Sequence, residues 1–161
     1  MADSNVAERA GVYGYSDARN ALQRTAQATG LLRVVSIAME AQEDGSVAFD
    51  DNKFSRWGPA IRVACSHVSE VRDGLIHKDF APSGVDWWTP LATLEAIDAA
   101  MWFTGAGGSG VEELTFDEVK AVMDAAIHVL TELHRDLSTV ADDLRKDAAE
   151  RATVGQKGGA A

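Results

Sequence analysis

The chain contains few side chains whose ordinary pKa lies near neutral pH. They are one cysteine and four histidines: Cys65, His67, His77, His128 and His134. A single cysteine forms no intrachain disulfide and builds no thiolate metal site by itself. The apolar, helical spacing around Cys65 predicts a buried free thiol. His67, beside Val68 at the edge of an apolar stripe, is predicted to be a hydrogen-bonded structural residue rather than a ligand.

Asp124, His128 and Glu132 follow one another at steps of four residues. On a helix they share one face, from which they could hold a metal ion. The same spacing is typical of a solvated row of ion pairs, and this interpretation is favoured because the apolar residues of the segment lie on the opposite face. No metal and no cofactor are therefore expected.

A glycine-rich stretch begins at Gly105 and reads Gly-Ala-Gly-Gly-Ser-Gly, which has the G-x-G-x-x-G spacing of a dinucleotide-binding turn. That turn requires a preceding strand and a βαβ unit, and neither is visible here. Glu112 and Glu113 follow shortly after and would repel a phosphate. The stretch is therefore predicted to be a helix–helix loop, not a phosphate site.

Arg72 and His77 stand in R-x4-H spacing, with a polar residue after the arginine and an aromatic residue, Phe80, after the histidine. This stretch loosely resembles the motif of HEPN-type helical ribonucleases. The resemblance implies metal-independent RNA cleavage at a dimer groove. Arg72 would stabilise the charge of the phosphorane and His77 would act as general base or acid. We keep this activity as an alternative hypothesis.

Hydrophobic spacing and capping signals predict four helices that would position these residues. The first begins with Ser16 or Asp17 as its cap and runs to about Ala41, and its apolar second half, 31–39, suggests a central, well-covered helix. The second begins near 55–59 and carries an apolar stripe as far as Leu75. The third begins with Thr89 as cap and Pro90 in its first turn.

The fourth predicted helix has the most regular pattern. Thr115-Phe-Asp-Glu118 has the form of a capping box, and the helix is expected to continue to about Arg151. Its apolar residues alternate at steps of three and four, which is the spacing of a heptad seam. They are Phe116, Val119, Met123, Ala126, Leu130, Leu133, Leu137, Val140 and Leu144. After Leu137 the flanking positions turn polar, as in a contact between two helices.

These elements predict an all-α four-helix bundle with an extended C-terminal helix. Residues 38–75 align without a gap with residues 100–137, so two duplicated helical hairpins are a possible origin. We expect a flexible segment at 1–15, one helical domain at 16–152 and a disordered tail at 153–161. We also expect a homodimer through Leu133, Leu137, Val140 and Leu144.

The net charge of −10 disfavours nucleic acids and anionic membranes as partners. The N-terminus lacks the basic and apolar regions of a signal peptide, and no long apolar run exists, so a cytoplasmic location is expected.

No convergent catalytic set is visible. The leading hypothesis is therefore a non-enzymatic interaction or regulatory protein of bacterial or phage type. Its partner surface would be Trp87 and Trp88, which could instead plug the bundle end, or an acidic face. An acidic mimic of nucleic acid is a third hypothesis.

Overall fold

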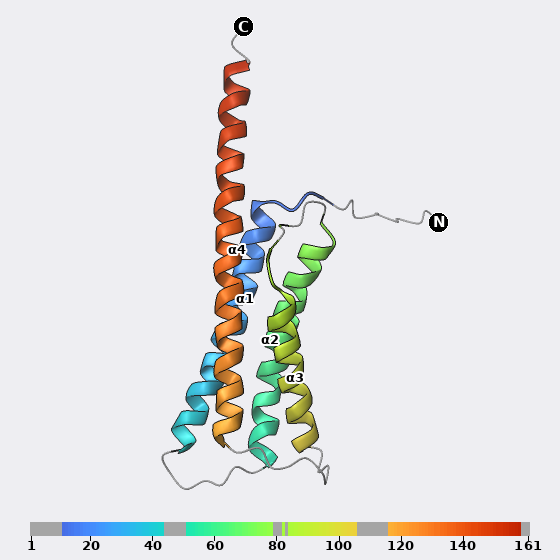
Figure 1. The fold of residues 1–161 in the computed structure, drawn as a ribbon, viewed down its shortest axis with the longest axis vertical. Coiled ribbons are helices and arrows are strands. Elements are labelled where there is room, and N and C mark those ends of the chain that lie inside the picture. Colours follow the sequence, from blue (N-terminus) through green and yellow to red (C-terminus); the bar gives the residue numbers. More distant parts are fainter. Residues whose placement is uncertain (1–10, 44–50, 79–81, 83, 106–115, 159–161) are drawn as a thin grey trace, which may run out of the picture.

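The computed structural model describes residues 11–43, 51–78, 82, 84–105 and 116–158. Within them the chain forms α1 (Tyr15–Glu43), α2 (Asp51–Ile76), α3 (Trp88–Gly105) and α4 (Phe116–Gly158). Successive helices run in opposite directions, and α4 rises beyond the other three (Figure 1). Contacts join α1 to α2 and α4, and they join α3 to the same two helices. The all-α four-helix bundle is thereby confirmed.

The core is made by one apolar stripe from each helix. Its largest fully buried side chains come from all four helices: Leu32, Met39, Ile61, Leu91, Leu94, Met123, Leu130, Leu133 and Leu137. Two buried threonines of α1 donate to carbonyl groups one turn back, Thr25 to Ala21 at 2.8 Å and Thr29 to Thr25 at 2.9 Å. Their hydroxyl groups are therefore satisfied inside an apolar environment.

The expectation that α1 is a central, well-covered helix is wrong. Val34 is 66% exposed and Ile37 is 64% exposed, although both lie in the apolar run 31–39. A helix at the corner of a four-helix bundle buries the stripe that faces its neighbours and leaves its back to solvent. The run is apolar on both sides, so it leaves two large side chains uncovered.

The start of α1 differs from the expected cap at Ser16 or Asp17. The carbonyl of Gly14 accepts hydrogen bonds from the backbone N–H groups of Asp17 and Ala18, both at 3.1 Å. The Asp17 carboxylate in turn accepts from the Gly14 N–H at 2.9 Å. Gly14 is therefore the cap, and Asp17 is the third helical residue reaching back to it, as the acidic half of a capping box does.

The start of α3 differs in the same way. The Asp86 carboxylate accepts a hydrogen bond from the Thr89 N–H at 3.0 Å, so Asp86 is the cap in place of Thr89. Hydrogen bonds from the backbone and side chain of Thr89 hold the pKa of Asp86 below its ordinary value. The second helix, α2, begins at Asp51, before the expected start, and includes Pro59 on an exposed position.

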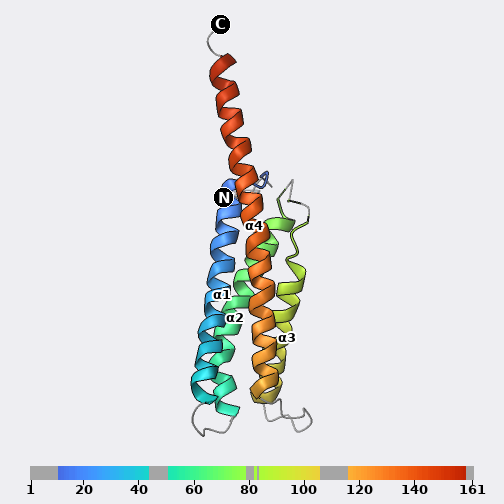
Figure 2. The same cartoon turned by 60° about the vertical axis from the view of Figure 1, so that its left-hand side comes forward.

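The last helix, α4, contains 43 residues and is about 64 Å long at 1.5 Å per residue. It continues to Gly158, beyond the expected end near Arg151 and through residues 153–158 of the expected tail. All residues from Arg145 to Arg151 are exposed. Figure 2 shows this part of α4 standing clear of the bundle.

Thr115 of the expected capping box lies outside the described residues, as do Gly107, Gly108 and Gly110.

The alignment of 38–75 with 100–137 relates core positions of α2 to core positions of α4. Both members of each of these pairs are buried: Ile61 and Met123, Ala64 and Ala126, Val68 and Leu130, Val71 and Leu133, and Leu75 and Leu137. The two helices stand at diagonal corners of the bundle, because each contacts α1 and α3 and not the other. The alignment therefore relates the core stripes of two helices at opposite corners of the bundle, and a duplicated origin stays a prediction. Among the described helices, none combines the length and apolar character needed to cross a membrane.

Substitution of Leu137 should test its assignment to the core. Leu137 is fully buried, whereas Leu144, one heptad later, is only partly buried. Leu137→Ala should lower the free energy of unfolding by about 2–5 kcal/mol, the cost of deleting a buried leucine side chain. Leu144→Ala should cost less than about half as much in the same urea titration. Equal losses in the two variants would contradict the packing described here.

Candidate functional site

Arg72 and His77 do not form a convergent pair. The Arg72 guanidinium binds the carboxylate of its neighbour Asp73, with Nη2 at 2.7 Å and Nε at 2.8 Å from Oδ1. His77 is exposed just after the end of α2, and its backbone N–H donates to the Asp73 carbonyl at 3.0 Å. At 3.6 residues per turn, a step of five residues places the two side chains about 140° apart around the helix axis. Neither residue lines a cavity described below.

The protein should therefore not cleave RNA through these two residues. Labelled single-stranded RNA incubated with the purified protein in EDTA should remain intact, since the cation and the histidine are not directed at one point. Any background cleavage should be equal in Arg72→Ala and His77→Ala proteins purified identically. Cleavage that is lost in both variants would overturn this assignment.

The expected row of ion pairs on α4 is present. Lys120 Nζ lies 2.9 Å from Glu40 of α1 and 3.0 Å from Asp124. Glu132 binds Arg135, which lies three residues later on the same helix. Each carboxylate of the row is therefore paired with a cation, although Lys120 also pairs with Glu40 and Arg135 also pairs with Asp136. Among the residues described, no group of three histidine, cysteine or acidic side chains is placed to hold a metal ion.

Cys65 is partly buried on α2. Burial raises the pKa of its thiol to about 11, and the negative charges of Asp98 and Glu95 add to this effect. The reactive thiolate is therefore almost absent at neutral pH, which removes Cys65 as a nucleophile. His67 contacts another side chain, as expected for a structural residue, because its Nδ1 lies 3.4 Å from Nη1 of Arg24.

Alkylation should show the raised pKa of Cys65 directly. At pH 8 the folded protein should react with iodoacetamide more than about tenfold slower than a free thiol of pKa about 8.5. Because the folded pKa is raised, the rate should keep increasing with pH toward about 11. Unfolding in urea should restore ordinary reactivity in the control. A plateau near pH 9 in the folded protein would contradict the raised value.

Trp87 and Trp88 have different surroundings. Their rings meet edge to face, with centroids 5.9 Å apart and planes at 80°. Trp87 is partly buried and packs against the core, as a plug over the bundle end would. Trp88 is 64% exposed. Of the predicted partner-binding pair, Trp88 therefore offers the accessible surface.

The four residues expected at a dimer interface are also divided. Leu133 and Leu137 lie in the core of the single chain, at 1% and 0% exposure, so their assignment is corrected from dimer contacts to core residues. The seam continues directly from the bundle core, and the single chain already covers these two positions. Val140 and Leu144 are partly buried at the edge of the core and retain accessible surface. Dimerisation remains a prediction for Val140 and Leu144.

Val140 and Leu144 line a hollow of about 500 Å³, which we call the α4 groove. Its other wall is the connector before α3, with Pro82, Gly84 and Val85. Gly84 has a φ of 96°, a left-handed conformation that favours glycine and turns the connector at this wall. The groove lies where α4 leaves the bundle, and its connector wall leads to Trp87 and to Trp88, the first residue of α3.

Three carboxylates also line the α4 groove: Asp136, Asp143 and Asp147. Arg135 Nε lies 3.7 Å from Asp136, and Lys146 Nζ lies 3.4 Å from Asp143. These cations are 67% and 72% exposed, so solvent weakens both pairs. The groove therefore combines an apolar strip, Val140 and Leu144, with three negatively charged side chains.

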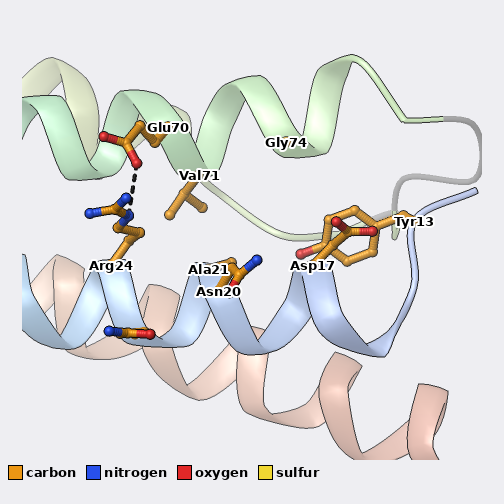
Figure 3. A pocket seen from close by; sticks show the side chains of 9 residues that line it. Tyr13, Asp17, Asn20, Ala21, Arg24, Glu70, Val71 and Gly74 are labelled. Carbon is orange, nitrogen blue, oxygen red and sulfur yellow. Dashed lines mark ion pairs between the residues drawn. The ribbon is translucent and has the colours of Figure 1, made fainter. Parts of the chain in front are cut away.

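A second hollow, of about 390 Å³, lies between α1 and α2 at the same end of the bundle (Figure 3). We call it the α1–α2 pocket. Tyr13, Asp17 and Asn20 line one part of it, and Arg24 and Glu70 line the other. Arg24 Nε binds the Glu70 carboxylate at 2.7 Å across the two helices. The lining is therefore mostly polar.

Comparison with protein-family models, with characterised proteins and with solved structures gave no match. The assignment of function consequently depends on the geometry of the two hollows.

No motif in the sequence predicts the α1–α2 pocket. Tyr13 fell within the segment 1–15 that was expected to be flexible, yet its side chain is buried in the core cluster. The available signal was an aromatic residue directly before a glycine cap with an acidic residue three positions later. The pairing of Arg24 with Glu70 joins residues far apart in the chain, and no local pattern indicates it.

Proposed function

We propose that this chain acts by binding another protein, without catalysis, and that the α4 groove receives a basic amphipathic helix of that partner. The observation that supports the proposal is the composition of the groove. Val140 and Leu144 provide an apolar strip one helical turn apart, and three aspartates line the same groove. A helix with apolar residues on one face and lysine or arginine beside them is complementary to such a surface.

Two neighbouring features support a protein partner over a small ligand. Trp88 is exposed close to the groove in sequence, three residues after Val85. Tryptophan is enriched among residues that dominate binding energy in protein interfaces. The exposed part of α4 beyond Leu144 extends the surface along the helix axis, so a partner helix could continue past the groove itself.

Charge also distinguishes between possible occupants of the groove. A second copy of the chain would bring its own Asp136, Asp143 and Asp147 to the same surface, and like charges in close approach are unfavourable. The chain carries a net charge of −10, which increases this repulsion. A basic partner gains from the same charges. The homodimer through Val140 and Leu144 is therefore the less favoured occupant, and it is tested separately by mass measurement in solution.

A fluorescent amphipathic peptide of leucine and lysine should bind to the protein, and a matched peptide of leucine and glutamate should not. Asp143→Asn with Asp147→Asn should weaken binding by about fivefold or more, since each exposed pair contributes up to about 1 kcal/mol. Asp142→Asn is the matched control, because Asp142 is an exposed aspartate of the same helix that does not line the groove. Added salt should weaken binding steeply.

Equal binding of the two peptides, or an equal effect of Asp142→Asn, would refute the groove as a site for a basic helix. A stable dimer by light scattering that Leu144→Asp converts to a folded monomer would instead assign the groove to a second copy.

A further inference from the structure

The Tyr13 hydroxyl is a buried polar group without a partner. The side chain is 3% exposed, and its oxygen has no hydrogen-bond partner among the described residues. Leaving such a group unpaired is costly, so it requires an explanation. A second unpaired atom, Nδ1 of His134, lines neither hollow. Tyr13, in contrast, lines the α1–α2 pocket.

Figure 3 shows how the side chains lie in this pocket. The Tyr13 hydroxyl points into the space between α1 and α2 from the segment that precedes α1, and Asp17 and Asn20 project toward the same space from the first two turns of α1. The far end is closed by the pair of Arg24 and Glu70. The volume of about 390 Å³ is within the range of small-molecule sites and is much larger than one water molecule.

The charges around the pocket favour a hydrogen-bond donor at the Tyr13 end. Burial raises the pKa of Tyr13 to about 12, and the negative charge of Asp17 adds to this shift. Lys78 Nζ lies 3.8 Å from Asp17 Oδ1, beyond hydrogen-bond distance, so it does not saturate the carboxylate. At the other end, Arg24 contacts Glu70 and His67. An anionic group at Tyr13 would face the Asp17 carboxylate.

We infer that the α1–α2 pocket binds a small organic molecule through a primary ammonium group held by the Tyr13 oxygen and the Asp17 carboxylate, with the Asn20 side chain beside them. An ammonium group has three donors and no acceptor, which matches the hydroxyl oxygen of Tyr13 and the carboxylate oxygens of Asp17. The Tyr13 ring adds an aromatic surface to the same site. Binding gives the buried hydroxyl the partner that it lacks in the free chain.

The separation of the two acidic residues of the pocket, Asp17 and Glu70, suggests the length of a suitable probe. Asp17 and Arg24 are seven residues apart on α1, or about 10.5 Å along its axis, and Glu70 lies at the level of Arg24. A diamine with four methylene groups covers about this distance when each nitrogen makes one hydrogen bond. It also presents an ammonium group whichever end enters first.

Calorimetry with three probes of one length tests the inference. The full chain should bind 1,4-diaminobutane with a stoichiometry of one, at least tenfold tighter than 1,4-butanediol, and should not bind succinate. Tyr13→Phe keeps the ring and removes only the hydroxyl, and it should weaken diamine binding by about tenfold. The matched control is Tyr15→Phe, since Tyr15 is exposed and lies outside the pocket. This substitution should change nothing.

Asp17→Asn should abolish binding of the diamine, and thermal melts of all variants establish that they remain folded. Absence of diamine binding to the parent chain would overturn the inference. Equal binding of diamine and diol, or unchanged affinity in Tyr13→Phe, would overturn it as well. The pocket and the α4 groove share no residue, so this experiment and the peptide titration can succeed or fail independently.

Discussion

Burial of the apolar stripe from Met123 to Leu137 on α4 is the interaction on which the bundle depends. This helix contacts both α1 and α3, so it joins the two hairpins into one core. Burying each of its large side chains contributes about 1.5–3 kcal/mol. The ion pairs around it are exposed and contribute little by comparison. The position of α4 in turn places the α3 connector against Val140 and Leu144, and so creates the groove.

The sequence was sufficient to predict the features that depend on the spacing of apolar residues along one helix. The stripe of α4, the four helices and the bundle all follow from apolar spacing, and the pairing of Asp124 and Glu132 with cations agrees with their predicted place on the solvated face. The spacing within one helix does not show which other helix covers its apolar stripe. The same spacing therefore assigned Leu133 and Leu137 to a second copy, although this chain covers them itself. It also predicted full burial of the run containing Val34 and Ile37, which the corner position of α1 prevents.

Helix ends were less predictable than helix faces. Gly14 and Asp86 replaced the expected caps because a cap is chosen by where the chain enters the bundle, and several residues near each start have suitable side chains. The shift at α1 matters for chemistry. It brings Tyr13 against the core and turns Asp17 back toward the helix start, so the polar pocket is a consequence of how α1 begins. Both hollows lie at the end of the bundle where α4 emerges.

The emergence of α4 from the bundle divides the helix into two folding regimes. Residues up to Leu144 gain their stability from tertiary packing, whereas the exposed residues 145–151 depend on local hydrogen bonds and neighbouring charges. A helical segment of about 14 residues is only marginally stable in isolation. Its amide protons should therefore exchange with solvent through fraying, while those of Met123 to Leu137 exchange only when the bundle opens. A partner seated at Leu144 would extend slow exchange outward along α4, so occupancy of the groove would set the length of the folded helix.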